Sequence, residues 1–363
     1  MKKYNTLLSS LVLVVSAISC ARAEANGSAG QIISFDVPGS ACQPAFFVCT
    51  QAFAINASGA VLGWYADSGR AMHGFLRGGD GSFVGIDPPG ATCGGGIFSV
   101  CSRPAAINDA GAITGFYNNA NGPHAYIRAA DGGYTTFEFP GAICCTNPSA
   151  IASDGTVIGY YIDANSIAQG FIRTKDGKYT TVDVPTGVNG TTLSAINPQG
   201  TIIGFYYDEN NNTHSFVRYR DGNIVEIAVP RSQGTYVAAI NPAGDIVGSY
   251  ADINLIYHGF ILRPNGSFVS FDAASPPFDT EPVGINPAGV IAGNCQRIDQ
   301  PCGGFVRAQN GSTTLFNPPN TIVTVVSGIN AAGVIAGWYD DVGYLQHAFI
   351  RFPRPVQTAE AGN

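Results

Sequence analysis

The sequence is short of charge. Lysine, arginine, aspartate and glutamate make up only 12% of the 363 residues, and the formal net charge is −7. A nucleic-acid partner would need clustered lysine and arginine to meet its phosphates. The composition therefore argues against nucleic-acid binding.

Long hydrophobic runs are also lacking. The apolar run 7–18 is too short for a comfortable membrane span. It follows Lys2 and Lys3 and precedes the small-residue site Ala21-Arg-Ala23, so residues 1–23 are predicted to be a secretory signal peptide. Alternatively, Cys20 is the lipidated cysteine of a bacterial outer-membrane lipoprotein. We expect a secreted protein, extracellular or periplasmic, without a transmembrane segment.

Sequence motifs typical of catalytic sites are missing too. The sequence has no recognisable catalytic triad, paired-carboxylate motif, phosphate-binding loop or histidine-rich metal box. It also lacks the Cys-x2-Cys spacing of zinc sites. We therefore predict neither a metal nor a cofactor.

What the sequence does contain is a repeat. A glycine in similar surroundings recurs about every 45 residues, and each unit holds several short apolar runs, a period typical of four-stranded propeller blades. No linker divides the chain, so we expect one domain over 24–353, monomeric in solution, followed by a short disordered tail at 354–363. The repeated glycines are Gly59, Gly111, Gly155, Gly200, Gly244, Gly289 and Gly333.

Turn residues divide each unit into strands a to d. Strand a ends in Ile-Asn and enters a turn such as Asn197-Pro-Gln-Gly200, which suits a type I turn into strand b. A longer polar loop such as 209–213 leads to strand c, which begins at a His-Gly-Phe or His-Ala-Phe signature. An Asp-Gly or Asn-Gly pair, such as Asp221-Gly222, predicts a type I′ turn into strand d.

The seventh unit stops after strand c, at Arg351-Phe-Pro353. Its missing strand d is found at the other end of the chain, where 31–39 matches the d strand 179–185. We therefore predict an all-β, seven-bladed β-propeller of four-stranded antiparallel blades, closed by the N-terminal strand pairing into the last blade. Closure of this kind leaves no exposed sheet edge.

Cysteines fit an oxidising compartment, since the chain without Cys20 has eight, an even number. Most lie in connections between strand d and the next strand a, close to a partner in the sequence. We predict disulfides Cys42–Cys49, Cys93–Cys101 and Cys295–Cys302, and a strained vicinal bond Cys144–Cys145.

Histidines occupy one repeat position, at the start of strand c. This rim also carries the b–c loops, the d–a connections and the cysteines, so it is the expected functional face. One interpretation is a ring of imidazoles that binds a metal or an anion; the other is a structural bond from each histidine to an aspartate at the end of strand b. The histidines are His73, His124, His214, His258 and His347, and the aspartates are Asp67, Asp163, Asp208, Asp252 and Asp340.

Two other sets are periodic and are interpreted as structural. Arginines two places after the signature aromatic residue are expected to pair across the blade surface; they are Arg77, Arg128, Arg173, Arg218, Arg307 and Arg351. An acidic residue after strand d is interpreted as a local cap; it appears as Asp36, Asp87, Glu138, Asp183 and Asp272.

Catalysis or binding of one ligand needs asymmetry, so residues that break the repeat on this face are candidates. A lyase with Tyr236 as base, and Arg231 or Arg103 neutralising a uronate, is conceivable. The candidates are Arg70, Arg103, Arg231, Tyr236, Glu281 and Arg297.

The pattern Ile-Asn-x-x-Gly-x-Ile-x-Gly-x-Tyr-x-Asp followed by His-Ala/Gly-Phe resembles the bacterial extracellular family named for its His-Ala-Phe (HAF) repeat. The motif appears as His347-Ala-Phe349 and His73-Gly-Phe75, while Gln169 and Gly303 depart from it. The resemblance covers about 31–352 and implies a secreted or cell-surface β-propeller, with no catalytic residue to carry over.

Three functions remain open at this point. The first is a non-enzymatic binding or scaffold protein whose partner is a polysaccharide or a surface protein. The second is an extracellular polysaccharide lyase or hydrolase, favoured if Arg231, Tyr236 and Glu281 cluster at the channel mouth. The third is metal-dependent assembly through the histidine ring.

Overall fold

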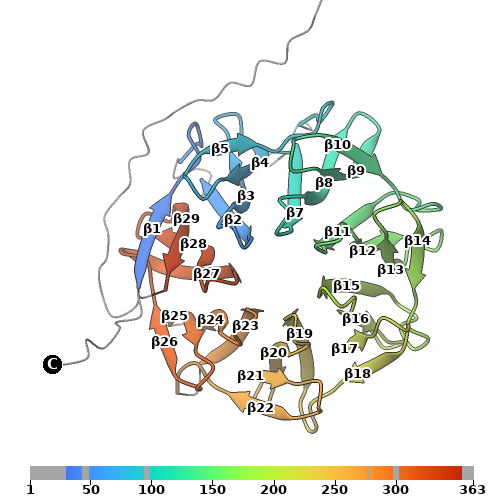
Figure 1. Cartoon of the computed structure of the whole chain (residues 1–363), viewed down its shortest axis with the longest axis vertical. Coiled ribbons are helices and arrows are strands. Elements are labelled where there is room, and N and C mark those ends of the chain that lie inside the picture. The colour runs from blue at the N-terminus through green and yellow to red at the C-terminus, as the bar shows by residue number, and fades with distance from the viewer. Residues whose placement is uncertain (1–29, 43–48, 94–98, 276–277, 297–301, 354–363) are drawn as a thin grey trace, which may run out of the picture.

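Short β-strands joined by tight turns make up the described chain, and they form seven sheets arranged in a ring (Figure 1). The structure is a computed structural model and describes residues 30–42, 49–93, 99–275, 278–296 and 302–353. The predicted signal peptide 1–23, Cys20 and the tail 354–363 lie outside the described residues. No helix that could cross a membrane occurs in the described ranges.

Blades 1 to 4 follow the chain, each with its strands in the order a to d. Blade 1 has β2 (Thr50–Ile55), β3 (Val61–Ala66), β4 (Ala71–Arg77) and β5 (Phe83–Gly85), with β6 (Ser99–Val100) added beside β4. Blade 2 has β7 (Ser102–Ile107), β8 (Ile113–Asn119), β9 (Gly122–Arg128) and β10 (Tyr134–Phe137). Blade 3 has β11 (Thr146–Ile151), β12 (Val157–Ile162), β13 (Ala168–Arg173) and β14 (Tyr179–Val182). Blade 4 has β15 (Thr191–Ile196), β16 (Ile202–Tyr207), β17 (Thr213–Arg218) and β18 (Ile224–Ile227).

Blades 5 to 7 continue the ring and close it. Blade 5 has β19 (Gly234–Ile240), β20 (Ile246–Ala251), β21 (Tyr257–Leu262) and β22 (Phe268–Phe271). Blade 6 has β23 (Asp279–Ile285), β24 (Ile291–Gln296), β25 (Gly303–Arg307) and β26 (Thr313–Phe316). Blade 7 has β27 (Thr321–Ile329), β28 (Ile335–Asp341), β29 (Gln346–Phe352) and, as its strand d, β1 (Gln31–Phe35). The predicted seven-bladed propeller with N-terminal closure is confirmed.

Each blade is held by an aromatic side chain of strand c that lies over a glycine of strand b. Phe75 is 1% exposed, and its ring lies where a side chain on Gly63 would stand. A Cβ on Gly63 would also collide with the carbonyl of Gln51 on strand a, where the register shifts between Ala52 and Ala54. The glycine is therefore required by close approach of both neighbouring strands.

Asparagines at the end of strand a link each blade to the next. Their side-chain amides donate to the carbonyl of the equivalent residue in the following blade, at 2.9 to 3.5 Å. Blade 3 has Ala152 at this position, so one link is missing. The members are Asn56, Asn108, Asn197, Asn241, Asn286 and Asn330. We call the edge of the ring with these a–b turns and the c–d turns the asparagine rim, and the edge with the b–c turns and d–a connections the histidine rim.

Two predictions about turns are wrong. At the c–d turn of blade 1, Gly81 donates to Gly78 and has φ of 88°, whereas Asp80 has no positive φ. This is a three-residue loop with a left-handed glycine, not a type I′ turn, which needs two positive φ values. The b–c connections are not longer: Asn211 donates to Asp208 just as Gly200 donates to Asn197 in the a–b turn.

Candidate functional site

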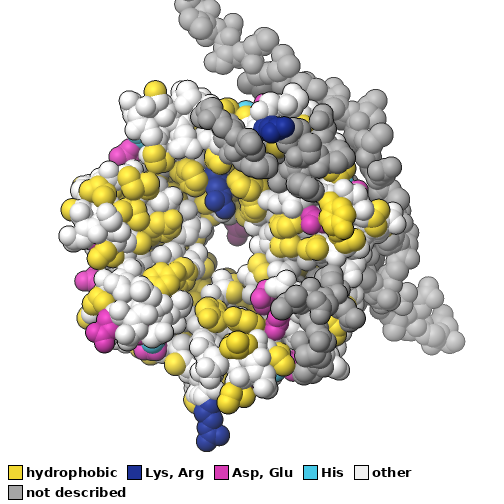
Figure 2. All heavy atoms as spheres, turned by 180° about the vertical axis from the view of Figure 1, so that it is seen from behind, with side chains coloured by type: hydrophobic (Ala, Val, Ile, Leu, Met, Phe, Trp, Pro, Cys, Tyr) yellow, Lys and Arg dark blue, Asp and Glu magenta, His cyan; other side chains and the backbone are white. Residues whose placement is uncertain are grey.

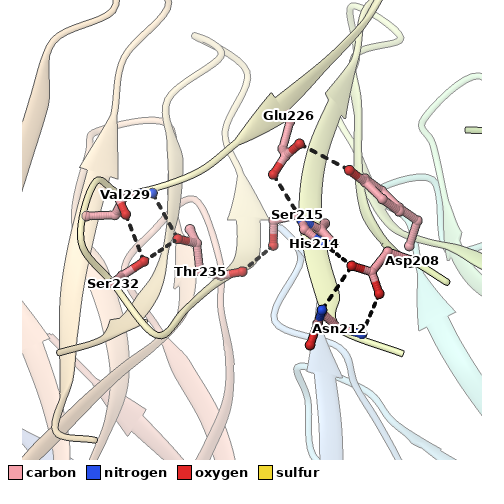
Figure 3. A network of polar contacts seen from close by, with 9 residues as sticks. Asp208, Asn212, His214, Ser215, Glu226, Val229, Ser232 and Thr235 are labelled. Carbon is pink, nitrogen blue, oxygen red and sulfur yellow. Dashed lines mark hydrogen bonds and ion pairs between the residues drawn. The ribbon is translucent and has the colours of Figure 1, made fainter. Parts of the chain in front are cut away.

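Every histidine of the repeat is held between two polar groups on the histidine rim. His214 illustrates the arrangement: Nδ1 lies 3.0 Å from Glu226 on the outermost strand, and Nε2 lies 3.2 Å from Asp208 in the b–c turn (Figure 3). The ring also stacks on Tyr206, with ring centroids 4.9 Å apart. The Nδ1 partners of the other histidines are Asp87 for His73, Glu138 for His124, Asp272 for His258 and Asp36 for His347.

This arrangement, which we call the histidine clasp, favours the structural interpretation of the histidines. It also corrects two predictions. In blades 1, 2, 5 and 7 the acidic residue after strand d is the clasp partner and not a local cap, because strand d brings it beside the histidine of strand c. In blade 4 the partner is Glu226, within strand d. In blade 7 the b–c aspartate is Asp341, 3.5 Å from His347 Nε2, and not the expected Asp340.

Clasps shift the pKa of their members. At His73, the hydrogen bond to Asp87 raises the pKa and outweighs burial, which lowers it. At His347, burial lowers the pKa, but the hydrogen bond and charge of Asp36 and the charge of Asp341 more than offset this, so the pKa is raised. A protonated imidazole between two carboxylates is the expected consequence.

Blades that lack the histidine keep part of the contact. Gln169 of blade 3 donates to Asp163 at 3.3 Å, which replaces the Nε2 bond of the clasp. In blade 6, Gly303 has φ of 99° and its face is filled by Asn317. The complete clasp is therefore limited to the five blades that carry a histidine.

Periodic arginines connect neighbouring blades. The guanidinium of Arg77 lies 4.9 Å from the ring of Phe35, which belongs to the strand d of the preceding blade. Arg173 on Phe137, Arg307 on Phe271 and Arg351 on Phe316 repeat this contact at 4.7 to 4.9 Å. These cation–π pairs stabilise the junctions between blades. The arginines therefore pair with residues of the neighbouring sheet, and not only across their own sheet as predicted.

The central channel is bounded by the strands a of all seven blades (Figure 1). Figure 2 shows the opening at its centre, surrounded by hydrophobic side chains, with basic and acidic side chains at different points of its edge. One position on strand a holds a different amino acid in each blade. The residue at this position pairs with the residue that follows the glycine of strand b, as Gln51 pairs with Trp64 after Gly63. We call it the channel position; it is occupied by Gln51, Arg103, Asn147, Thr192, Tyr236, Glu281 and Val325.

Three of the candidates named from the sequence thus occupy equivalent places. Tyr236 and Glu281 lie on neighbouring blades, and Tyr257 connects them: its ring is 5.8 Å from that of Tyr236, and its backbone nitrogen donates to Asp279 at 2.8 Å. Gln296 donates to Glu281 at 2.7 Å. We call these five residues the blade 5/6 cluster.

The blade 5/6 cluster perturbs two pKa values. Burial raises the pKa of Glu281, the charge of Asp279 adds to the rise, and the hydrogen bond from Gln296 opposes it. Burial also raises the pKa of Tyr257, with the charge and hydrogen bond of Tyr236 and the charge of Glu281 adding to the effect. A neutral tyrosine pair beside a carboxyl group offers donors, acceptors and an aromatic surface in one place.

Other candidates are not part of this cluster. Arg103 lies on blade 2, where its guanidinium is 5.1 Å from the ring of Trp64. Arg231 and Arg70 lie in the connection entering blade 5 and in the b–c turn of blade 1, both with positive φ. Arg297 lies outside the described residues. An enzyme is favoured if Arg231, Tyr236 and Glu281 cluster at the channel mouth. Only Tyr236 and Glu281 lie together, and no hydrogen bond or ion pair joins Arg231 to them within the described ranges.

Sequence reasoning missed Tyr257, Asp279, Gln296 and the shared channel position. The channel position could have been found from the sequence. Each channel residue stands five places before the repeated asparagine after strand a, as Tyr236 does before Asn241; in blade 3 that asparagine is replaced by Ala152. The cluster partners could not be found in this way. They depend on how the start of strand a of blade 6 lies against blade 5.

Exposed apolar side chains gather at two b–c turns of the histidine rim. Ile253 is 80% and Leu255 67% exposed in blade 5, and Val342 and Tyr344 are 69% and 62% exposed in blade 7. Leu255 and Tyr344 have φ of 61° and 62°, a conformation that bulky residues adopt at a cost. Such exposed and strained tips are typical of surfaces that contact a ligand.

The asparagine rim offers a different kind of site. A cavity of about 240 Å³ at this end of the channel is lined by the last residues of the strands a, among them Ile55, Ile107, Ile151 and Ile329. Another, of about 430 Å³, lies between blades 6 and 7 and is lined mainly by alanine and valine beside Arg351. Neither cavity is lined by a residue of the blade 5/6 cluster.

Three of the four predicted disulfides are confirmed: Cys42–Cys49, Cys93–Cys101 and Cys295–Cys302. The vicinal bond is wrong, since Cys144 and Cys145 are free thiols. Burial raises the pKa of Cys145 to about 11, and the neighbouring Cys144 adds to the rise. A thiol with so high a pKa is a poor nucleophile at neutral pH.

Comparison with known proteins places the fold only. No protein-family model and no curated protein matches the chain. A streptogramin B lyase structure is similar with a TM-score of 0.55 at 13% identity, covering 89% of this chain and 97% of that one. A virginiamycin B lyase from Staphylococcus aureus gives 0.56 at 12%, covering 89% and 99%. A puromycin hydrolase gives 0.57 at 12%, covering 85% of this chain and 52% of that one.

Proposed function

We propose that the protein is a secreted, non-enzymatic binding module that takes a carbohydrate at the histidine-rim mouth of its channel. The single observation that carries this proposal is the channel position, where one place in the repeat differs in every blade. Structural positions of the repeat, such as the clasps and the asparagines, are reused from blade to blade. A position that is varied within a fixed frame is the expected place for ligand recognition.

The chemistry of the blade 5/6 cluster suits a sugar. Tyr236 is 38% exposed and offers a ring face and a hydroxyl, while Glu281 and Gln296 offer acceptors and donors beside it. Sugars present apolar faces of C–H groups and a fringe of hydroxyls, which such a set meets. The resemblance to the HAF repeat family, which implies a secreted or cell-surface propeller, agrees with this proposal.

A direct test measures retention of the full chain on immobilised acidic and neutral polysaccharides. We expect retention on at least one of them, and a loss of at least tenfold in affinity for Tyr236→Ala. Tyr219→Ala is the matched control, because Tyr219 is 42% exposed but lies in a c–d turn on the asparagine rim. Equal losses in both variants, or no retention on any polysaccharide, would contradict the proposal and direct the search to protein partners.

A second candidate is a polysaccharide lyase or hydrolase, and the raised pKa of Glu281 is the observation that favours it. A carboxyl group with a raised pKa can act as a general acid near neutral pH. Incubation with the retained polysaccharide would then produce new unsaturated or reducing ends. Glu281→Gln should abolish these ends while retention persists; retention without new ends supports the binding module.

A further inference from the structure

The disulfides Cys42–Cys49 and Cys93–Cys101 each lie beside a histidine clasp, and the same backbone hydrogen bond places both of them. The second cysteine of each pair donates its backbone nitrogen to the residue that precedes the histidine: Cys49 to Gln346 at 3.3 Å, and Cys101 to Met72 at 3.0 Å. The d–a connection thereby crosses the start of strand c of the preceding blade. Both sulfurs of each pair are brought beside the imidazole.

At the junction of blades 7 and 1 this places four possible metal ligands together. One ligand atom from each of Asp36, Cys42, Cys49 and His347 lies within 4.8 Å of the others. Cys49 is fully buried, and the His347 side chain is 16% exposed. Two sulfurs, an imidazole and a carboxylate form a typical four-coordinate set for Zn²⁺.

We propose that this group is a redox-dependent zinc site, closed while Cys42 and Cys49 are bonded and opened when that bond is reduced. A dithiol reductant supplies two electrons and two protons, becomes a disulfide itself, and leaves two thiols. Zinc then displaces the two thiol protons and binds both sulfurs. Metal binding requires thiolates, so the oxidised pair cannot hold the ion.

The geometry needs only a small adjustment. Ligand atoms around tetrahedral zinc stand about 3.3–3.8 Å apart, given bonds of about 2.0–2.3 Å. The sulfurs of Cys42 and Cys49 must move apart by about 1.5 Å on reduction, because a disulfide holds them about 2.0 Å apart. The other ligand atoms lie within 4.8 Å of one another and close by about 1 Å at most. The carboxylate of Asp341, 3.5 Å from His347 Nε2, is placed to support the imidazole as an outer partner.

The chain contains its own comparison sites. His73, Cys93 and Cys101 form the equivalent group at the next junction, but there the group has three ligand residues within 4.8 Å and not four. The Cys295–Cys302 pair is followed by Gly303, where the repeat has lost its histidine. That pair should therefore hold no zinc after reduction.

A filled site would join three segments. Asp36 directly follows β1, His347 lies on β29, and Cys49 leads into β2. The ion would thus tie the strand pair that closes the ring to the entry of blade 1. The proposal does not depend on the carbohydrate site, which lies on blades 5 and 6.

Cobalt(II) titration tests the site, since thiolate-bound tetrahedral Co²⁺ absorbs in the near ultraviolet and the visible. The background chain keeps only the Cys42–Cys49 and Cys295–Cys302 pairs; serine replaces Cys20, Cys93, Cys101, Cys144 and Cys145. After anaerobic reduction with a phosphine and desalting, we expect one Co²⁺ per chain with both bands, displaced by Zn²⁺. The oxidised chain should show neither band.

Three variants of this background decide the assignment. Adding Cys42→Ser and Cys49→Ser should abolish both bands, whereas Cys295→Ser with Cys302→Ser should leave them unchanged. His347→Gln should weaken Co²⁺ binding at least tenfold. The proposal would be overturned by the absence of both bands in the reduced background, or by bands that persist without Cys42 and Cys49. It would also be overturned if far-ultraviolet circular dichroism showed that the protein unfolds on reduction.

Discussion

Asn330 of blade 7 donates its side-chain amide to the backbone carbonyl of Asn56 in blade 1, at 3.0 Å. The same side chain accepts the backbone nitrogens of Ala332 and Val334 at 3.0 and 2.9 Å. One asparagine therefore shapes its own turn and connects the last blade to the first. The ring is closed at two places, here at its inner edge and at β1 on its outer edge.

Asn330→Ala should lower the free energy of unfolding by about 2–3 kcal/mol, because it removes three hydrogen bonds that contribute about 1 kcal/mol each. Urea denaturation followed by circular dichroism measures the change. Asn310→Ala is the control: its side chain caps Ser312 in an exposed c–d turn, and we expect about 0.5 kcal/mol or less. Similar effects in the two variants would argue against a special role for the inner ring of asparagines.

Gly63→Ala should be strongly destabilising, by more than about 3 kcal/mol, because the new methyl group meets both the Gln51 carbonyl and the Phe75 ring. Gly85→Ala, in strand d of the same blade, adds a methyl group that meets nothing within 4 Å. It should change the stability by about 0.5 kcal/mol or less. Thermal unfolding of both variants measures the difference, and a tolerated Gly63→Ala would contradict the observed packing.

The clasps should make stability depend on pH. His73 and His347 have raised pKa values in the folded protein, so their contribution is complete below the unfolded histidine pKa of about 6.5 and is lost as pH rises through the higher folded value. We expect the wild-type Tm to fall over this window, on the alkaline side of pH 6.5. The double variant His73→Gln, His347→Gln should show a smaller fall; an unchanged pH profile would contradict the prediction.

Leu255→Gly should stabilise the protein by about 0.5–1 kcal/mol. The substitution removes the strain of leucine in a left-handed conformation, about 1–2 kcal/mol. Part of this gain is lost because glycine increases the conformational entropy of the unfolded chain. Asn211→Gly, at the same place in blade 4, is the control with little expected gain, since asparagine tolerates this conformation. Chemical denaturation measures both, and polysaccharide retention of Leu255→Gly shows whether the strained tip contacts the ligand.

The architecture could be predicted from the sequence because it depends on repeated, local signals. The missing strand d after Phe352 and the matching segment at Gln31 were sufficient to predict ring closure. Closely spaced cysteines gave three disulfides correctly. For Cys144 and Cys145, adjacency alone did not produce the strained bond.

Details that depend on one torsion angle or on packing between blades were harder to predict. Asp80-Gly81 suits two kinds of turn, which differ in loop length and in the φ of Asp80. The partner of each histidine on strand d is not its neighbour in the sequence; Asp36 and His347 are 311 residues apart. The blade 5/6 cluster forms because the backbone nitrogen of Tyr257, at the start of β21, donates to Asp279, at the start of β23 in the next blade.

The place of β1 has a consequence for how the protein is made. It is among the first strands to be synthesised and must be the last to be paired, because its partner β29 is completed only at Phe352. Until then β1 is an unpaired strand and blade 7 does not exist as a four-stranded sheet. Ring closure therefore waits for the final residues of strand c, and the pairing of β1 with β29 is the step that removes the last open sheet edge.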